Sequence, residues 1–294
     1  MGPISHELSQ GRRHFQHGPI DIIAYAEGDP ISVARAHEAA WQRFGQILPE
    51  LVDELAELRK PVGSAGALKG PIAQTMWHAC KACLIESDVD AFLTPMAAVA
   101  GSVAQDLSAC YQASGIRRAW INNGGDIALH LTNDTAVSIG LFADLARFDA
   151  QQLVAGVQTD AVFEVKYGMG ISGVATSGWR GRSFSLGIAD SVTVFASSAS
   201  QADAAATMIA NAVDIADARI VRQPANTLKD DSDLGGQLVT VAVPALSQDE
   251  IHDALEAGLK KAHTLKQNGL ICASVLNCQG WFASTEAARI QRIS

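Results

Sequence analysis

The apolar positions of this chain recur with two spacings, and each spacing predicts one kind of element. Short apolar runs bounded by Gly, Asn and Asp predict strands. We expect strands at 20–25, 118–123, 126–131, 135–140, 161–168, 170–176, 191–196, 237–243, 270–276 and 280–285. Longer runs with helical spacing predict helices at 31–59, 71–87, 94–115, 198–216 and 247–267, and residues 222–236 form a polar loop between elements.

The order of these elements favours an α+β fold. The predicted helices come first as a group, the predicted strands follow as a group, and only then do the two alternate. The regular alternation of strand and helix that is typical of a doubly wound sheet is therefore missing. We expect a twisted antiparallel sheet packed against helices. No repeat or polar linker divides the chain, so residues 1–294 are expected to form a single domain, with two intimate lobes left open. Ser32 and Thr94 are the expected helix caps, and Pro71 and Pro95 fit first turns.

Composition and charge narrow the class of protein. Of 294 residues, 48% are hydrophobic and 18% are charged, which is ordinary for a globular protein. The formal net charge of -9 comes without a basic run, so we expect no nucleic-acid partner. No apolar run approaches the length that crosses a bilayer, and the N-terminal residues lack an apolar leader core. A cytoplasmic protein without a membrane partner is expected.

The chain has five cysteines, and an odd number favours reduced thiols. Cys80 and Cys83 form a CxxC pair without a second pair, which is weak support for zinc. Buried helix cysteines are the simpler interpretation.

The stretch "WINNGGDIALHL" (120–131) carries two glycines between two strands. Asn123-Gly124 is a strong hairpin signal, because a type I′ turn needs positive φ at both central residues. Glycine also leaves backbone bare for a ligand. Gly124, Gly125 and Asp126 are therefore either turn residues alone or also one wall of a binding site.

Asp203 and Thr207 are four residues apart on a predicted helix and share one face. A carboxylate and a hydroxyl suit Mg²⁺, which takes few protein ligands and keeps waters or phosphate oxygens. The alternative is structural, because Ser200 and Asp203 also match a capping box at the start of that helix.

The stretch "ATSGWRGRSFSLGIAD" (175–190) follows a strand. Thr176, Ser177 and Gly178 offer hydroxyls and bare backbone N–H groups, while Arg180 and Arg182 offer paired donors. Phosphate or carboxylate groups are bound by such donors. A solvated loop face is the alternative.

Three of these stretches, taken in order, resemble the ApbE superfamily, the FAD:protein FMN transferases. "NNGGDI" is similar to its GGDI segment, "ATSG" to its TSG strand end, and "SVTVFASSASQADAAATMIANAV" to its SVTV strand and D-x-x-x-T helix. The resemblance is closer to an uncharacterised branch of that superfamily. Segments at 15–22, 70–76, 94–106, 121–127 and 178–196 carry it.

The resemblance implies a T-fold-like α+β fold and a ligand site. It implies Mg²⁺, or Ca²⁺, at Asp203 and Thr207 and an FAD or FMN ligand. The implied cofactor-binding residues are Gly124, Gly125, Thr176, Ser177 and Gly178. The expected catalytic residues are Arg180 and Arg182, which would bind phosphate or a second substrate, and Asp126, which would line the site; the two arginines lie where this chain departs from the transferases. It also links the branch to sulfur or one-carbon metabolism.

Two departures from the transferases change the expected chemistry. The histidine-bearing element between TSG and SVTV is replaced by "GRSFSLGIAD", and no histidine occurs between His130 and His252. The Lys-Gly-Tyr element is replaced by "AVAGSVAQD". Protein flavinylation by the standard mechanism is therefore not expected. His14 and His17, near a strand start, are the remaining histidines in the matching segments, and no general base is identified.

Two functions from different classes fit these observations. One is a transferase or hydrolase that acts with Mg²⁺ on a flavin nucleotide or another small anionic ligand. The other is an accessory protein that binds a cofactor or metabolite without catalysis. In either case we expect a homodimer, because antiparallel sheets leave edges that a partner subunit commonly covers.

Overall fold

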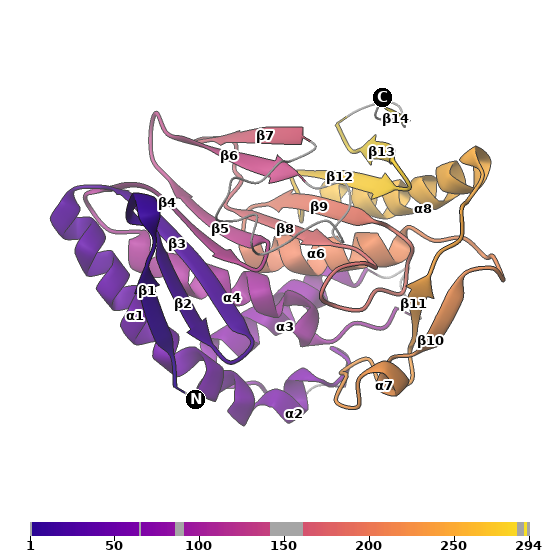
Figure 1. Ribbon diagram of the computed structural model, residues 1–294, viewed down its shortest axis with the longest axis horizontal. Helices are drawn as coiled ribbons and strands as arrows, with labels where there is room; N and C mark the ends of the chain where they lie inside the picture. Colours follow the sequence, from indigo (N-terminus) through magenta and orange to yellow (C-terminus); the bar gives the residue numbers. More distant parts are fainter. Residues whose placement is uncertain (1, 65, 86–90, 142–160, 287–290, 293–294) are drawn as a thin grey trace. The chain divides into compact units, whose positions relative to one another are not determined.

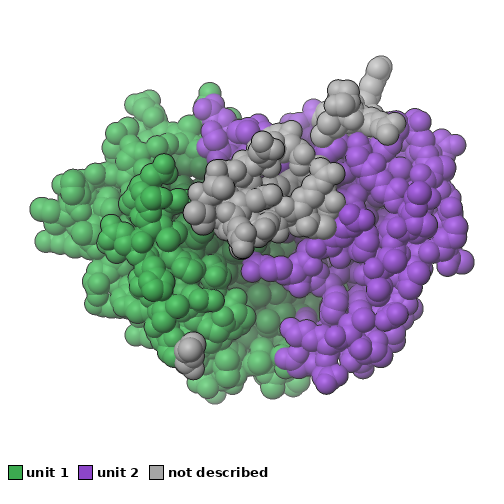
Figure 2. Space-filling model, viewed as in Figure 1, with its two compact units in different colours: residues 1–137, 165–175, 195–204 green, residues 138–164, 176–194, 205–294 purple. Residues whose placement is uncertain are grey.

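The computed structural model describes residues 2–64, 66–85, 91–141, 161–286 and 291–292. The chain forms two compact units (Figure 2). Unit 1 comprises residues 1–137, 165–175 and 195–204, and unit 2 comprises residues 138–164, 176–194 and 205–294. Strands β8 (Gly173–Ser177) and β9 (Ser191–Ala196) and helix α6 (Ala199–Ala212) contribute residues to both units.

The strands of unit 1 form an antiparallel meander (Figure 1). Neighbouring strands follow the order β1-β2-β3-β4-β5-β8, and each of these pairings is antiparallel. Their bounds are Ile4–Glu7 (β1), Arg13–His17 (β2), Ile20–Gly28 (β3), Ile116–Asn123 (β4) and Asp126–Leu131 (β5). The polar β1 and β2 were not predicted, because their residues lack the apolar alternation that identifies a strand. The predicted α+β class with an antiparallel sheet is confirmed.

Two helices of unit 1 pack on this sheet. Helix α1 contacts β2 and β3, and α4 contacts β4 and β5. The bounds are Ser9–Gly11 (η1), Pro30–Asp53 (α1), Leu55–Leu58 (α2), Pro71–Cys83 (α3), Pro95–Ala98 (η2), Val99–Ser108 (α4) and Ala109–Tyr111 (η3). The expected cap of α1 was wrong. Asp29 caps this helix, and the backbone N–H of Ser32 donates to its carboxylate at 2.9 Å.

The helix predicted at 94–115 is three short pieces. Ala98 has φ -122 and ψ 16, which interrupts the helix, so η2 ends there and α4 begins at Val99. The Thr94 side chain makes no cap hydrogen bond to η2. Helix α3 ends at Cys83, whereas the predicted end, Ser87, lies outside the described residues.

Unit 2 contains a second set of strands and its own long helix. Helix α8 packs against β12 and β13, and α7 packs against β10. The bounds are Ala136–Leu141 (β6), Ala161–Lys166 (β7), Val221–Pro224 (β10), Ala225–Leu228 (α7), Leu238–Ala242 (β11), Gln248–Gln267 (α8), Ala273–Cys278 (β12), Trp281–Ser284 (β13) and Gln291–Arg292 (β14). Strands β6 and β7 begin or end in unit 1. The loop predicted at 222–236 was wrong in its first half, because β10 and α7 lie there.

Strand β10 pairs antiparallel with β11, and β12 pairs antiparallel with β13. Helix α8 opens with a capping box in which Ser247 and Glu250 bond reciprocally to each other's backbone N–H groups. Within the part of the chain that the structure describes, no helix is both long and apolar enough to cross a membrane.

Candidate functional site

The hairpin between β4 and β5 turns through two glycines. Asn123 pairs with Asp126, so Gly124 and Gly125 are the two central residues, with φ 65 and φ 116. The predicted turn centred on Asn123-Gly124 was therefore wrong by one residue. The reason is Asn122, whose Oδ1 accepts a hydrogen bond from the Gly125 backbone N–H at 2.8 Å. Asp126 begins the return strand and is half-buried.

Helix α6 is capped by Ser198, not by the predicted Ser200–Asp203 box. The Ser198 Oγ accepts a hydrogen bond from the Gln201 backbone N–H at 3.3 Å. The Ser200 hydroxyl instead donates to Gln105 Oε1 at 2.8 Å. Asp203 therefore lies one turn inside the helix, where it is not needed as a cap of α6.

The Asp203 carboxylate binds the first turn of another helix, α4. Its Oδ2 accepts a hydrogen bond from the Gly101 backbone N–H at 2.8 Å, and the Ala100 N–H also donates to it. Helix α4 has no side-chain cap of its own at Ala98, so Asp203 satisfies N–H groups that its first turn leaves open. The Asn123 side chain donates to the Ala100 carbonyl at 3.1 Å, which ties the glycine hairpin to the same turn.

Gly101 makes this approach of the two helices feasible. A Cβ at this position would lie 2.3 Å from the Ala199 carbonyl oxygen and 2.8 Å from the Asp203 Cβ. The small residues predicted at 94–106 thus serve close helix packing. Sequence reasoning did not connect Gly101 with Asp203.

A second carboxylate lies near Asp203. Burial raises the pKa of Asp203 well above its usual range, and the neighbouring Asp126 carboxylate raises it further. The two backbone N–H donors of α4 act in the opposite direction and only partly offset these effects. Asp126 and Asp203, predicted separately, thus form one electrostatic pair in unit 1.

The donors present fit a divalent cation that keeps most of its own water or ligand oxygens. Among the described residues, no group of three or more His, Cys, Asp or Glu side chains could enclose a metal. Two carboxylates with mutual repulsion are nevertheless suited to a hard cation, which would favour the charged form of both. Thr207 lies one turn further along α6 and is half-buried, in the part of the helix that belongs to unit 2. Its role as a metal ligand stays a prediction.

The loop that follows β8 lies in unit 2 and is built around Asp190. Trp179 donates its indole N–H to Asp190 Oδ1 at 3.2 Å, and the Arg180 guanidinium carbon lies 4.8 Å from the centre of the Trp179 ring. Arg180 and Arg182 are both exposed. Sequence reasoning selected the arginines but missed Trp179 and Asp190, which carry no recognisable motif.

Of the residues that precede this loop, Thr176 has a structural partner. The Thr176 and Thr193 hydroxyl oxygens lie 2.9 Å apart, and Ser177 is half-buried. A Cβ on Gly178 would lie 2.4 Å from the Asp190 carbonyl oxygen, so this glycine is required for packing. The predicted cofactor-binding roles of Thr176, Ser177 and Gly178 stay predictions.

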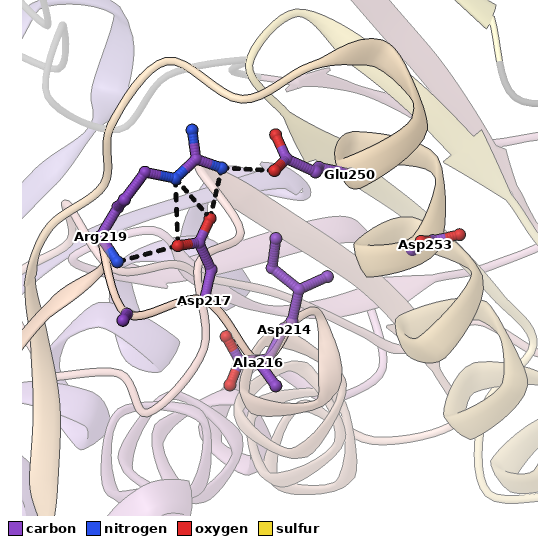
Figure 3. A pocket seen from close by; sticks show the side chains of 8 residues that line it. Asp214, Ala216, Asp217, Arg219, Glu250 and Asp253 are labelled. Atoms are coloured by element: carbon purple, nitrogen blue, oxygen red, sulfur yellow. Dashed lines mark hydrogen bonds and ion pairs between the residues drawn. The ribbon is translucent and has the colours of Figure 1, made fainter.

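An open pocket of about 510 Å³ lies elsewhere in unit 2 (Figure 3). It is lined by Asp214, Ile215, Ala216, Asp217, Ala218, Arg219, Glu250 and Asp253. Figure 3 shows Arg219 bound to both Asp217 and Glu250. Arg222, which is not drawn in this view, pairs with Asp214 at 2.5 Å. The excess of carboxylates makes this pocket unsuitable for a phosphate.

Cysteine and histidine chemistry finds little support. Burial, with Asp190 nearby, raises the pKa of the Cys278 thiol to about 12, which keeps it protonated. Cys80 and Cys83 are buried on α3. His14 Nε2 lies 3.0 Å from Asp21 Oδ1 across β2 and β3.

A comparison with models of protein families finds a match over most of the chain. The model described as "AbpE bacteria" matches residues 5–284. The chain belongs to this family. It is also 45% identical over 118 residues to a "UPF0280 protein" of Methanothermobacter thermautotrophicus, covering 40% of this chain and 41% of that protein. A "UPF0280 protein" of Methanococcus vannielii is 34% identical over 171 residues, covering 55% of this chain and 64% of that protein.

The matches cover 41% and 64% of the lengths of these two relatives, so the chain spans only part of the curated relatives that it matches. Among solved structures, the apo flavinyl transferase ApbE of Pseudomonas stutzeri aligns with a TM-score of 0.45 and 13% identity, covering 96% of this chain and 94% of that one. The ApbE protein of Thermotoga maritima aligns with a TM-score of 0.41 and 13% identity, covering 99% and 96%.

Proposed function

We propose that this AbpE-family protein binds a divalent cation at Asp126 and Asp203 and acts as a transferase or hydrolase on a flavin nucleotide or another small anionic metabolite. The observation that carries the proposal is the Asp126–Asp203 pair, whose mutual repulsion and burial raise the Asp203 pKa. Perturbed carboxylate pairs of this kind are common at functional sites.

Residues of unit 1 would hold the cation and contact the ligand. Asp203, fixed by the first turn of α4, presents its carboxylate beside Asp126, and both are suited to hold Mg²⁺ or Ca²⁺. A bound cation of this kind supplies charge neutralisation for phosphate oxygens. Gly124 and Gly125 present a hairpin backbone without side chains, which is the predicted contact surface for the ligand.

For unit 2, considered by itself, we propose that Arg180 or Arg182 makes a charge-assisted contact to an anionic group of a small molecule. Both side chains are exposed, and a guanidinium matches the paired oxygens of phosphate or carboxylate. The departure of this loop from the histidine-bearing element of the transferases supports a small-molecule acceptor, or water, in place of a protein hydroxyl.

The test is incubation of the purified protein with FAD and Mg²⁺, followed by separation of the nucleotides. Hydrolysis adds one water across the pyrophosphate bond and yields FMN and AMP in equal amounts. We expect both products with Mg²⁺ and neither with EDTA or in Asp203→Asn. Glu38→Gln, an exposed helix carboxylate, is the control for loss of a negative charge.

The second candidate function is a cofactor-binding accessory protein. It is favoured by the absence of a histidine in the replaced element. FAD or FMN bound at equilibrium without AMP release would support it against the enzyme. Failure of both flavins and of Mg²⁺ to bind would contradict the two candidates together.

A further inference from the structure

The first residues of loop 178–187 in unit 2 are held by the buried carboxylate of Asp190, which is 8% exposed, whereas Asn211 binds Ser185 and Leu186 at the other end of the loop. Its Oδ2 accepts a hydrogen bond from the Gln279 backbone N–H at 2.5 Å, and its own backbone N–H donates to the Asn277 carbonyl at 3.0 Å. Asp190 is thus fixed by the turn between β12 and β13, and its Oδ1 is left to receive the Trp179 indole N–H at 3.2 Å.

The Trp179 ring is fixed from both of its ends. The indole N–H is bound to Asp190, and the Trp179 backbone N–H donates to the Ala189 carbonyl at 3.0 Å. Arg180 lies over the face of this ring, with its guanidinium carbon 4.8 Å from the ring centre. A guanidinium stacked on an indole has fewer accessible rotamers, which reduces the entropy lost when a ligand binds.

The geometry points to Asp190 as a positioning residue for ligand binding: it orients Trp179, and Trp179 in turn holds the Arg180 guanidinium toward a phosphate or carboxylate group. The inference rests on the proposed anion contact of Arg180 and adds to it the residues that set the arginine's position. The alternative role of Asp190 is purely structural, as an anchor between loop 178–187 and the β12–β13 turn.

A double-mutant cycle separates the two roles. The probe is FMN, titrated by its fluorescence, against wild type, Arg180→Ala, Trp179→Phe, Asp190→Asn and the two double variants that contain Arg180→Ala. Trp179→Phe keeps an aromatic face but removes the indole N–H, so it tests the Asp190 bond without disturbing the Gln279 turn. Arg35→Ala, an exposed arginine on α1, is the control for loss of one positive charge.

We expect Arg180→Ala to weaken FMN binding at least about tenfold, and Trp179→Phe and Asp190→Asn to weaken it about three- to fivefold. In the Arg180→Ala background the last two changes should have no further effect, because they act through the arginine. Arg35→Ala should bind as wild type does.

Other outcomes overturn the inference in distinguishable ways. If Arg180→Ala binds FMN normally, the proposed anion contact is wrong and the inference fails with it. If Arg180→Ala weakens binding but Trp179→Phe does not, or if the losses add fully in the double variants, Asp190 is structural and only the inference fails. Should Asp190→Asn not fold, the Trp179→Phe cycle alone decides.

Discussion

Two carboxylates, Asp203 in unit 1 and Asp190 in unit 2, share one kind of contact but differ in the other groups that lie near them. Each is at least half-buried and each accepts a hydrogen bond from a backbone N–H of a distant segment, Gly101 for Asp203 and Gln279 for Asp190. Asp190 also receives the Trp179 indole N–H. Asp203 instead has a second carboxylate, Asp126, beside it.

The difference shows how surroundings assign roles to chemically identical groups. A carboxylate whose neighbours are donors is a satisfied anchor and is suited to orient other side chains. A carboxylate that lies near another carboxylate is repelled by its negative charge, and a bound cation offsets this repulsion. Asp190 is therefore interpreted as a positioning residue and Asp203 as a cation ligand.

The largest expected effects come from Gly101 and Gly178, two glycines that are packed against backbone atoms near these aspartates. In Gly101→Ala the new Cβ meets the Ala199 carbonyl oxygen at 2.3 Å, and in Gly178→Ala it meets the Asp190 carbonyl oxygen at 2.4 Å. Backbone atoms cannot move aside as side chains do, so we expect a loss of at least about 2 kcal/mol in the free energy of unfolding for Gly101→Ala. Urea denaturation measures it.

Gly178→Ala should cost less, because its position in a loop allows the backbone to shift, but it should disturb Asp190. The matched controls are Gly63→Ala and Gly236→Ala, whose Cβ atoms would meet nothing within 4 Å. Stability losses in the controls as large as that of Gly101→Ala would show that close packing is not the cause.

Much of the fold could be predicted from sequence because strand periodicity and turn residues are local signals. Strands 126–131 and 191–196 were predicted at their observed bounds. The site is different, because it depends on contacts between distant segments. Asp203 and Gly101 are 102 residues apart, and Trp179 meets Asp190 through an indole N–H that no spacing rule identifies. Local reasoning left Asp203 either as a metal ligand or as part of a capping box of its own helix, and it did not foresee that its carboxylate binds the first turn of α4.

A smaller expected effect is the difference in stability between Asp203→Asn and Asp203→Ala, which separates the charge of this side chain from its hydrogen bonding. Asp203→Asn keeps an oxygen that accepts the Gly101 N–H but removes the charge, whereas Asp203→Ala removes both. We expect Asp203→Ala to be less stable than Asp203→Asn by about 1 kcal/mol, the usual contribution of an N-terminal cap. Thermal unfolding with and without Mg²⁺ measures both properties.

Wild type should gain stability when Mg²⁺ is added, since a ligand that binds only the folded state raises its melting temperature. Neither Asp203 variant should gain it. If Asp203→Asn gains as much from Mg²⁺ as wild type does, Asp203 is a tertiary cap of α4 and not a metal ligand.

The smallest expected effect is a pH dependence of the free energy of unfolding, which tests whether Asp126 and Asp203 interact. Because the folded state raises the pKa of Asp203, the unfolded chain loses this proton first as pH rises from about 4, its ordinary range. The folded state then binds more protons than the unfolded state, so this group lowers stability with increasing pH, by at most about 1.4 kcal/mol per pH unit. The loss is complete above the folded pKa.

Asp126→Asn removes the second cause of the raised Asp203 pKa but leaves burial, so the stability of this variant should fall less steeply across the same pH window. The difference between the urea midpoints of wild type and Asp126→Asn, measured at intervals from pH 4.5 to pH 8 in EDTA, reports the titration of the Asp126–Asp203 pair and cancels that of distant groups. A difference that stays constant with pH would mean that the two carboxylates do not interact, and the cation site proposed for them would lose its electrostatic basis.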